Sequence, residues 1–176
     1  MRGRTRVAVA VVGGLAAAAA AGAVLLLGGS GHAPVRPAKV VANDVSGRGT
    51  ACLAADSATA AAGATVTGVW SAMQAAAGTG QQQRNVQQLI MPATDAEQAR
   101  PYLAGLLSQR CDLIVTVGRP FGQAAPALSV GHQGVRFVAV DAALPGDPPP
   151  GVTLLAGDQA PDAVRRQVSE MAVSKK

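Results

Sequence analysis

One short stretch, Cys111 to Gly118, most constrains what this 176-residue chain can fold into. Between Leu113 and Gly118 only Thr116 is polar, and β-branched residues dominate. A short apolar run closed by glycine is typical of a strand that is buried on both of its faces. Such strands belong to parallel sheets with helices on both sides, so the stretch predicts an α/β fold.

The chain from residue 51 onward alternates between strand and helix patterns. Four further strands are expected over residues 51–56, 85–91, 135–141 and 152–158. Helical patterns lie between and after them, over residues 66–77, 94–109, 120–130 and 161–173. Alternation of this kind implies right-handed crossovers and a doubly wound parallel sheet, with the flavodoxin-like strand order 2-1-3-4-5. The sequence therefore predicts one α/β lobe of about five strands and four helices.

Several local features mark where these elements begin and bend. Ser57–Ala64 contains small residues without an apolar period and is expected to be a loop, after which Thr65 caps the first helix. Thr94 and Glu97 have the spacing of a capping box. Pro101 lies inside the helix that follows and is expected to kink or split it, because proline removes a backbone hydrogen bond.

An uncharged stretch, Val7–Leu27, follows arginines at positions 2, 4 and 6. Its 21 residues reach about 30 Å as a helix, which is enough to cross a bilayer. A cleaved signal peptide usually has an apolar core of roughly 7–15 residues, so residues 1–29 favour an uncleaved signal anchor over a signal peptide. No cysteine lies near the end of the run, which argues against a lipid anchor.

The N-terminal arginines keep their end in the cytoplasm, so both readings place the rest of the chain outside it. Residues 30–50 are rich in Gly, Pro, Ser and Ala and predict a disordered linker. Residues 51–176 form the single lobe. The expected location is the cell membrane, with one span and an extracytoplasmic domain, or secretion if the signal is cleaved.

The net charge of +5 comes from the N-terminal part of the chain. Residues 1–50 hold six Lys/Arg and one Asp, whereas residues 51–176 hold nine Lys/Arg and nine Asp/Glu. A nucleic-acid surface would need basic residues clustered on the domain. We therefore expect no nucleic-acid partner.

The two cysteines begin two strands that the predicted order makes neighbours. Cys52 opens the first strand and Cys111 opens the third, both at the edge of the sheet where strands begin. Their expected separation suits a disulfide, and export supplies an oxidising compartment, so we predict a Cys52–Cys111 bond over two buried thiols. The spacing is not that of a C-x-x-C redox motif, and no further ligands suggest a metal or cofactor.

Residues Cys111–Ala142, with the pattern CDLIVTVG followed by a helix and VRFVAVDA, resemble the first lobe of the basic membrane protein family. Members of that family are substrate-binding proteins of ABC transporters with the type I periplasmic-binding fold. The resemblance extends over about residues 50–160 and implies that strand carboxyl ends hold a ligand, often a nucleoside. By position, Asp56, Gly118 and Asp141 match site positions of the family.

Three further residues complete the candidate ligand-binding set. Ser57 follows Asp56 directly, and Arg119 could meet an anion at a helix amino terminus, although a solvated loop arginine is an equal alternative. The family's stacking aromatic is missing, and Phe121 could replace it unless it belongs to the core. Asp141 serves either a ligand hydroxyl or the cap of the next turn.

The length of the chain limits the function that the resemblance implies. A type I binding protein closes a ligand between two lobes, whereas this sequence contains one. The first hypothesis is a solute-binding lobe that acts with an ABC permease, a second lobe in trans or a second copy. The alternative is an envelope interaction or structural domain that kept the fold without the ligand. We expect no enzyme, because the sequence has no Ser/His/Asp arrangement and no phosphate-binding glycine loop.

Overall fold

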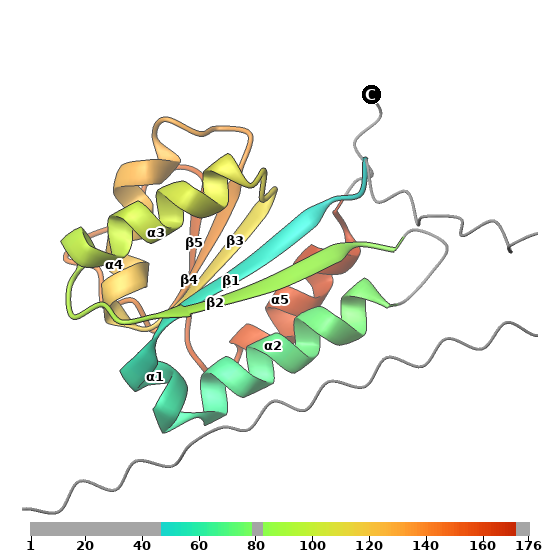
Figure 1. Cartoon of the computed structure of the whole chain (residues 1–176), viewed down its shortest axis with the longest axis horizontal. Helices are drawn as coiled ribbons and strands as arrows, with labels where there is room; N and C mark the ends of the chain where they lie inside the picture. The colour runs from blue at the N-terminus through green and yellow to red at the C-terminus, as the bar shows by residue number, and fades with distance from the viewer. Residues whose placement is uncertain (1–46, 79–82, 172–176) are drawn as a thin grey trace, which may run out of the picture. The chain divides into compact units, whose positions relative to one another are not determined.

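The computed structural model describes residues 47–78 and 83–171, and in them the five predicted strands form one parallel sheet (Figure 1). The strands are β1 (Thr50–Asp56), β2 (Asn85–Met91), β3 (Leu113–Val117), β4 (Arg136–Val140) and β5 (Val152–Leu155). Their order is β2-β1-β3-β4-β5, which confirms the predicted fold class. All strands begin at one edge of the sheet, here called the amino edge, and end at the other, the carboxyl edge.

β3 lies at the centre of the sheet, where both of its faces are covered, and four of its five residues are apolar. All five of its residues are buried. It pairs with β1 on one side, where Leu53 faces Val115, and with β4 on the other, where Val115 faces Val138. The central position places the turn after β3 between the turns after β1 and β4, where open α/β sheets hold ligands.

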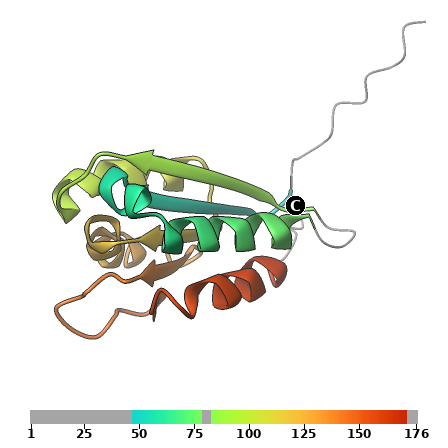
Figure 2. The same ribbon diagram turned by 90° about the horizontal axis from the view of Figure 1, so that it is seen from below.

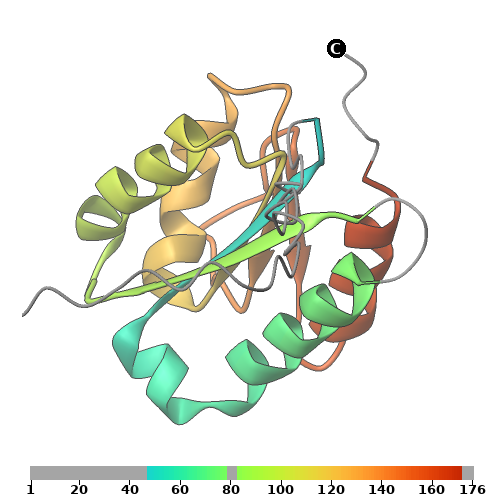
Figure 3. The ribbon, with the colours of Figure 1, turned by 45° about the vertical axis from the view of Figure 1, so that its right-hand side comes forward.

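Two helices cover each face of the sheet (Figures 1 and 3). α2 (Ala64–Ala77) and α5 (Ala160–Ser169) lie side by side on one face, as Figure 2 shows from below. α3 (Ala96–Ser108) and α4 (Arg119–Ser129) lie on the other face. Each pair buries apolar side chains against the sheet, so both cores are formed within residues 51–171, and residues 42–176 make one compact unit.

The structure corrects the predicted start of the first crossover. Ser57–Ala62 is a short helix, α1, rather than a loop. α2 then begins after Gly63, whose φ of 92° turns the chain, and it has no side-chain cap, so the prediction that Thr65 caps it is wrong. The reason is physical: an alanine-rich segment has high helix propensity, and Asp56 supplies the cap that starts it.

α3 also begins differently from the prediction. Its N-cap is Asp95, which accepts a hydrogen bond from the Gln98 backbone N–H at 2.9 Å, and Gln98 Oε1 accepts from the Thr94 N–H at 3.2 Å. The reciprocal pair is therefore shifted by one residue from the predicted Thr94 and Glu97. α3 continues through Pro101 as one helix, so the chain is not split there.

The N-terminal predictions lie outside the described residues. β1 begins at Thr50, within the stretch predicted as linker, and the expected span at Val7–Leu27 and most of the linker belong to residues 1–46. Within residues 47–78 and 83–171, no helix is long and apolar enough to cross a membrane.

A disulfide joins Cys52 and Cys111 at the amino edge, with a Cα–Cα distance of 5.9 Å. It connects β1 to the turn before β3, as the strand order predicts. Gln87 of the neighbouring β2 donates from Nε2 to both sulfur atoms, at 2.9 Å and 3.2 Å. Three strands of the sheet are thus linked at one point of this edge.

Candidate functional site

A small crevice lies at the carboxyl edge, between the α1–α2 turn and the ends of β3 and β4. Its volume is about 150 Å³. The lining residues are Thr59, Ala62, Gly63, Ala64, Thr65, Val117, Gly118 and Asp141. Because β3 and β4 are neighbours, their carboxyl ends bring Gly118 and Asp141 to this one cavity, as the predicted topology requires.

Asp56 and Gly118 lie together against a third residue, Thr59; Thr59 and Gly118 line the crevice, whereas Asp56 does not. Thr59 donates its backbone N–H to Asp56 Oδ1 at 2.8 Å and its hydroxyl to Asp56 Oδ2 at 2.6 Å. Asp56 is buried and is the N-cap of α1. Both of its carboxylate oxygens are therefore engaged within the chain, and the structure uses Asp56 to start a helix.

Gly118 allows this close approach. Its φ is 89°, in the region that favours glycine, and a Cβ built on it would lie 2.5 Å from Thr59 Oγ1. Its backbone N–H donates to Val140 O at 3.0 Å. The Thr59 side chain thus occupies the position that a Cβ at residue 118 would take, and the crevice lies beside it.

Asp141 is exposed and adopts a φ of 50°, which is uncommon for a non-glycine residue. Its Oδ1 accepts from the Gly157 N–H at 2.9 Å, across the turn that follows β5. A Cβ built on Gly157 would lie 2.5 Å from Asp141 Oδ2 and 3.0 Å from Thr65 Oγ1. The carboxylate therefore joins two turns of the carboxyl edge next to the Thr65 hydroxyl.

The remaining predicted residues are separate from the crevice. Ser57 and Arg119 are exposed at the first positions of α1 and α4, and neither lines the cavity. Phe121 is fully buried between the sheet and α3, with its ring centroid 6.3 Å from that of Tyr102. The idea that Phe121 stacks on a ligand is wrong, because the first turn of α4 directs it into the core.

Thr59 and Thr65 line the crevice but are not predicted as site residues from the sequence. Both lie in or after the stretch read as a loop, so their positions could not be assigned. One signal was available: Asp-x-x-Thr at residues 56–59 is a helix-start spacing in which the cap and the third helical residue meet.

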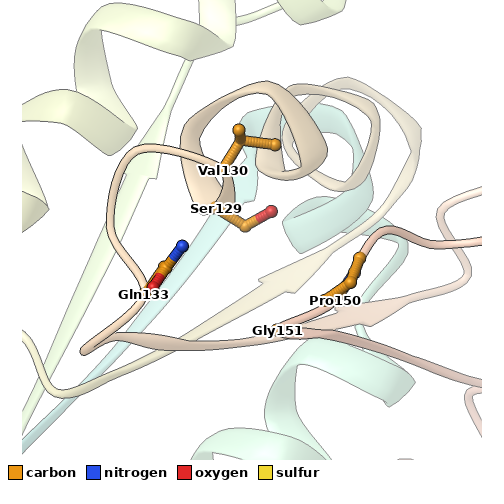
Figure 4. A pocket seen from close by; sticks show the side chains of 5 residues that line it. All are labelled: Ser129, Val130, Gln133, Pro150 and Gly151. Carbon is orange, nitrogen blue, oxygen red and sulfur yellow. The ribbon is translucent and has the colours of Figure 1, made fainter.

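Two larger hollows lie along α4, away from the carboxyl-edge crevice. One of about 380 Å³ is lined by Ser129, Val130, Gln133, Pro150 and Gly151, between the end of α4 and the start of β5 (Figure 4). The other, of about 360 Å³, lies between α4 and the proline-rich β4–β5 loop, where Gln123 Nε2 donates to Ala143 O at 2.9 Å. Neither brings together a set of ionisable side chains.

The fold and the crevice define a single-lobe parallel α/β domain whose carboxyl-edge polar groups are largely paired with one another. No protein-family model matches the chain, and no curated protein matches it. Among solved structures, the chain is similar to a crystal structure described as a fragment of a "putative lipoprotein" from Peptoclostridium difficile 630. That likeness has a TM-score of 0.55 at 15% identity and covers 71% of this chain and 100% of the other.

A second likeness, to the crystal structure of Drosophila Piwi, has a TM-score of 0.41 at 11% identity and covers 68% of this chain and 16% of that one. It is too low to support an argument. The lipoprotein fragment supports the fold, and its complete coverage means that the alignment includes the whole of that fragment. The comparisons give no support to the basic membrane protein family specifically.

Proposed function

We propose that this chain is an exported, membrane-tethered and non-catalytic domain that binds another envelope protein at its carboxyl edge. The observation that carries the proposal is the crevice there, which is small and has the Thr59 side chain, packed against Gly118, as part of its wall. Small-molecule sites usually have volumes of roughly 300–1,000 Å³ and bury most of the ligand. A crevice of about 150 Å³ instead suits a surface that another protein covers.

The non-catalytic part of the proposal is supported by how the ionisable groups are used. The Asp56 carboxylate caps α1, and Asp141 holds the turn at Gly157. His132, at the other edge, contacts the Leu128 carbonyl oxygen through Nδ1 at 2.8 Å. Each of these groups thus has a local structural contact.

The tether is supported by the apolar run at Val7–Leu27 and by the disulfide, which fits an oxidising compartment. The similar structure is described as a lipoprotein, but a lipid anchor of that type needs a free N-terminal cysteine. The two cysteines of this chain are both in the Cys52–Cys111 bond. The proposed anchor is therefore the apolar run itself.

A solute-binding lobe is the second candidate, favoured by the convergence of Gly118 and Asp141 at one cavity. It corresponds to the resemblance to the basic membrane protein family. In this case a permease, a second lobe in trans or a second copy would supply the other wall, and Thr59 would have to move away from Gly118.

A thermal-shift screen of the domain against nucleosides and small anions separates the two candidates. A ligand at 100 times its Kd stabilises a protein by about 2.7 kcal/mol, which is a shift of several degrees for a domain of this size. If the chain is a protein-interaction domain, no solute should produce such a shift. A photoreactive residue placed at Ser57 should then form a discrete cross-link to one envelope protein. A solute-dependent shift that Thr65→Val or Asp141→Asn abolishes would establish the second candidate instead.

Export is tested separately, with the full chain in cells. A C-terminal alkaline phosphatase fusion is expected to be active, and Cys52 and Cys111 are expected to be alkylated only after reduction. An inactive fusion with both thiols freely alkylated would place the domain in the cytoplasm and exclude the tether.

A further inference from the structure

The fold separates the charges of a domain that is nearly neutral as a whole. Its described residues include eight arginines and nine acidic residues. Five arginines lie at the amino edge or in the last turn of a helix that ends there: Arg48, Arg84, Arg110, Arg136 and Arg166. Among the described residues, this edge has two acidic side chains, Asp112 and Glu170. One of them, Asp112, accepts from the Thr50 N–H at 2.8 Å.

The carboxyl edge has the opposite charge. Its acidic residues outnumber its arginines within the described part of the chain: Arg119 begins α4, and Arg100 lies one turn into α3. The acidic residues follow strands or begin helices: Asp56, Asp95, Glu97, Asp141, Asp158 and Asp162. The separation cannot be read from the sequence, where the two kinds of residue are interspersed. It arises because successive turns of a parallel sheet lie at opposite edges.

Not all amino-edge arginines are available to a partner. The carbonyl ends of the helices carry partial negative charge at this edge, and Arg84 donates to the Ser169 and Met171 carbonyls at the end of α5. Arg48 donates to Gln83 Oε1 at 3.0 Å. Arg136 donates to the Gln167 carbonyl at 3.5 Å but is still exposed, as are Arg110 and Arg166, so surplus positive charge of this edge faces solvent.

An apolar side chain accompanies these arginines. Val130, which follows α4 at the amino edge, is 69% exposed and borders the hollow shown in Figure 4. Exposed aliphatic groups beside basic residues are typical of surfaces that bind the interface of an anionic membrane.

The chain also enters the domain at this edge. The first described residue, Gly47, precedes β1 there, and 19 residues separate it from the end of the apolar run at Leu27. Even fully extended, 19 residues span at most about 65 Å, so an anchored domain stays close to the bilayer. α5 ends at the same edge, and Lys175 and Lys176 follow it in the sequence.

We propose that the amino edge docks on the headgroups of an anionic phospholipid membrane, with Arg110, Arg136, Arg166 and Val130 at the contact. The carboxyl-edge crevice then faces away from the bilayer, toward its partner. This inference rests on the membrane tether of the proposed function. Tethering raises the effective concentration of the membrane surface to the millimolar range, so the tethered domain is oriented if the free domain binds vesicles at about millimolar accessible lipid.

The test is cosedimentation of residues 42–176, which carry a complete core, with vesicles of phosphatidylcholine alone or mixed with phosphatidylglycerol. The domain is expected to bind the anionic vesicles and to lose that binding at high salt. Arg110→Gln with Arg136→Gln should weaken binding about 25-fold, since each basic residue near an anionic surface contributes roughly fivefold.

The matched control is Arg100→Gln with Arg165→Gln, which removes the same charge elsewhere. Arg100 lies near the start of α3, and Arg165 is turned toward Asp162 in the first turn of α5. This control should change vesicle binding less than twofold. Equal losses in the two double variants would show a response to net charge and would overturn the proposal.

A second readout reports the orientation. Val130→Trp should show a blue-shifted emission on anionic vesicles after subtraction of Trp70, whereas Ser57→Trp, at the carboxyl edge, should not. No binding to anionic vesicles, or binding to a soluble polyanion such as heparin but not to vesicles, would exclude the docking surface. Because these assays use the isolated domain, their failure leaves the export result unaffected, and failure of export is seen only in the phosphatase fusion.

Discussion

The amino and carboxyl edges of the sheet are formed by the same five strands but are held together in different ways. At the amino edge the links join distant parts of the chain: the disulfide spans 59 residues, and the Thr50–Asp112 bond spans 62. At the carboxyl edge the side-chain bonds span fewer residues. The Asp56–Thr59 and Asp95–Gln98 bonds each span three, the Asp141–Gly157 bond spans 16 and the Gln123–Ala143 bond spans 20. The amino edge therefore links the most distant parts of the chain, whereas the carboxyl edge consists of helix caps and of bonds between turns that are closer together in the sequence.

This difference fits the division of roles proposed above. A surface that meets the membrane and receives the tether gains from rigid links between strands. A surface that binds a partner gains from loops that vary independently on a rigid scaffold. The comparison predicts that the largest losses of stability follow from changes at the amino edge.

Removal of the disulfide by Cys52→Ala with Cys111→Ala is expected to have the largest effect. Closing a loop of 59 residues is expected to contribute on the order of 4 kcal/mol, chiefly by constraining the unfolded chain. Urea denaturation of the double variant and of the oxidised wild-type protein measures this difference in the free energy of unfolding. A reductant should destabilise only the wild-type protein. Equal stabilities of the two proteins would show that the disulfide at the amino edge does not stabilise the domain.

At the carboxyl edge, Gly118→Ala is expected to cost roughly 3 kcal/mol. The change places a Cβ 2.5 Å from Thr59 Oγ1 at a φ of 89°, a conformation that costs alanine about 1–3 kcal/mol before the clash is counted. Gly105→Ala is the control, because nothing lies within 4 Å of its Cβ in the interior of α3. Alanine there should stabilise the protein by about 0.5–1 kcal/mol. An unchanged midpoint for Gly118→Ala would mean that Thr59 does not occupy this space.

Asp56→Ala is expected to cost about 1–2 kcal/mol through the loss of the α1 cap. Thr59→Val, which removes the hydroxyl donor but keeps the backbone N–H bond, should cost less. These changes also test whether the Asp56 carboxylate serves as a helix cap or is kept for a ligand. A residue kept for a ligand often destabilises the free protein, so a more stable Asp56→Ala protein would favour the solute-binding candidate.

The sheet could be predicted from the sequence because each strand is a short apolar run and the alternation with helices fixes the connections. β3 and the strand order followed from Leu113–Val117 and its neighbours. The disulfide then followed from the order. Residues that depend on tertiary placement could not be derived in the same way: the direction of Phe121 is set by how α4 packs, not by its neighbours in sequence.

The predictions for α1 and for the cap of α3, both at the carboxyl edge, were wrong for a related reason. α1 has no apolar period, since its residues are small and none is buried, so hydrophobic pattern could not reveal it. At α3, both Thr94 and Asp95 are good caps, and only the position of Gln98 decides between them. The charge separation needed the topology, because it depends on which edge each turn occupies.

The smallest expected effect has the opposite sign and concerns Arg110. This residue follows the C-cap of α3 with a φ of 61°, and the Arg110 and Cys111 N–H groups close the helix onto Leu107 O and Leu106 O. Helices that end in this way usually have glycine at the position of Arg110. Arg110→Gly should therefore stabilise the domain by about 1 kcal/mol in urea denaturation, since it removes the strain of a left-handed non-glycine residue. The same variant should bind anionic vesicles roughly fivefold less well. A gain in stability without a loss of binding would show that the arginine has no role at the membrane, and the two edges would then differ only in how they are linked.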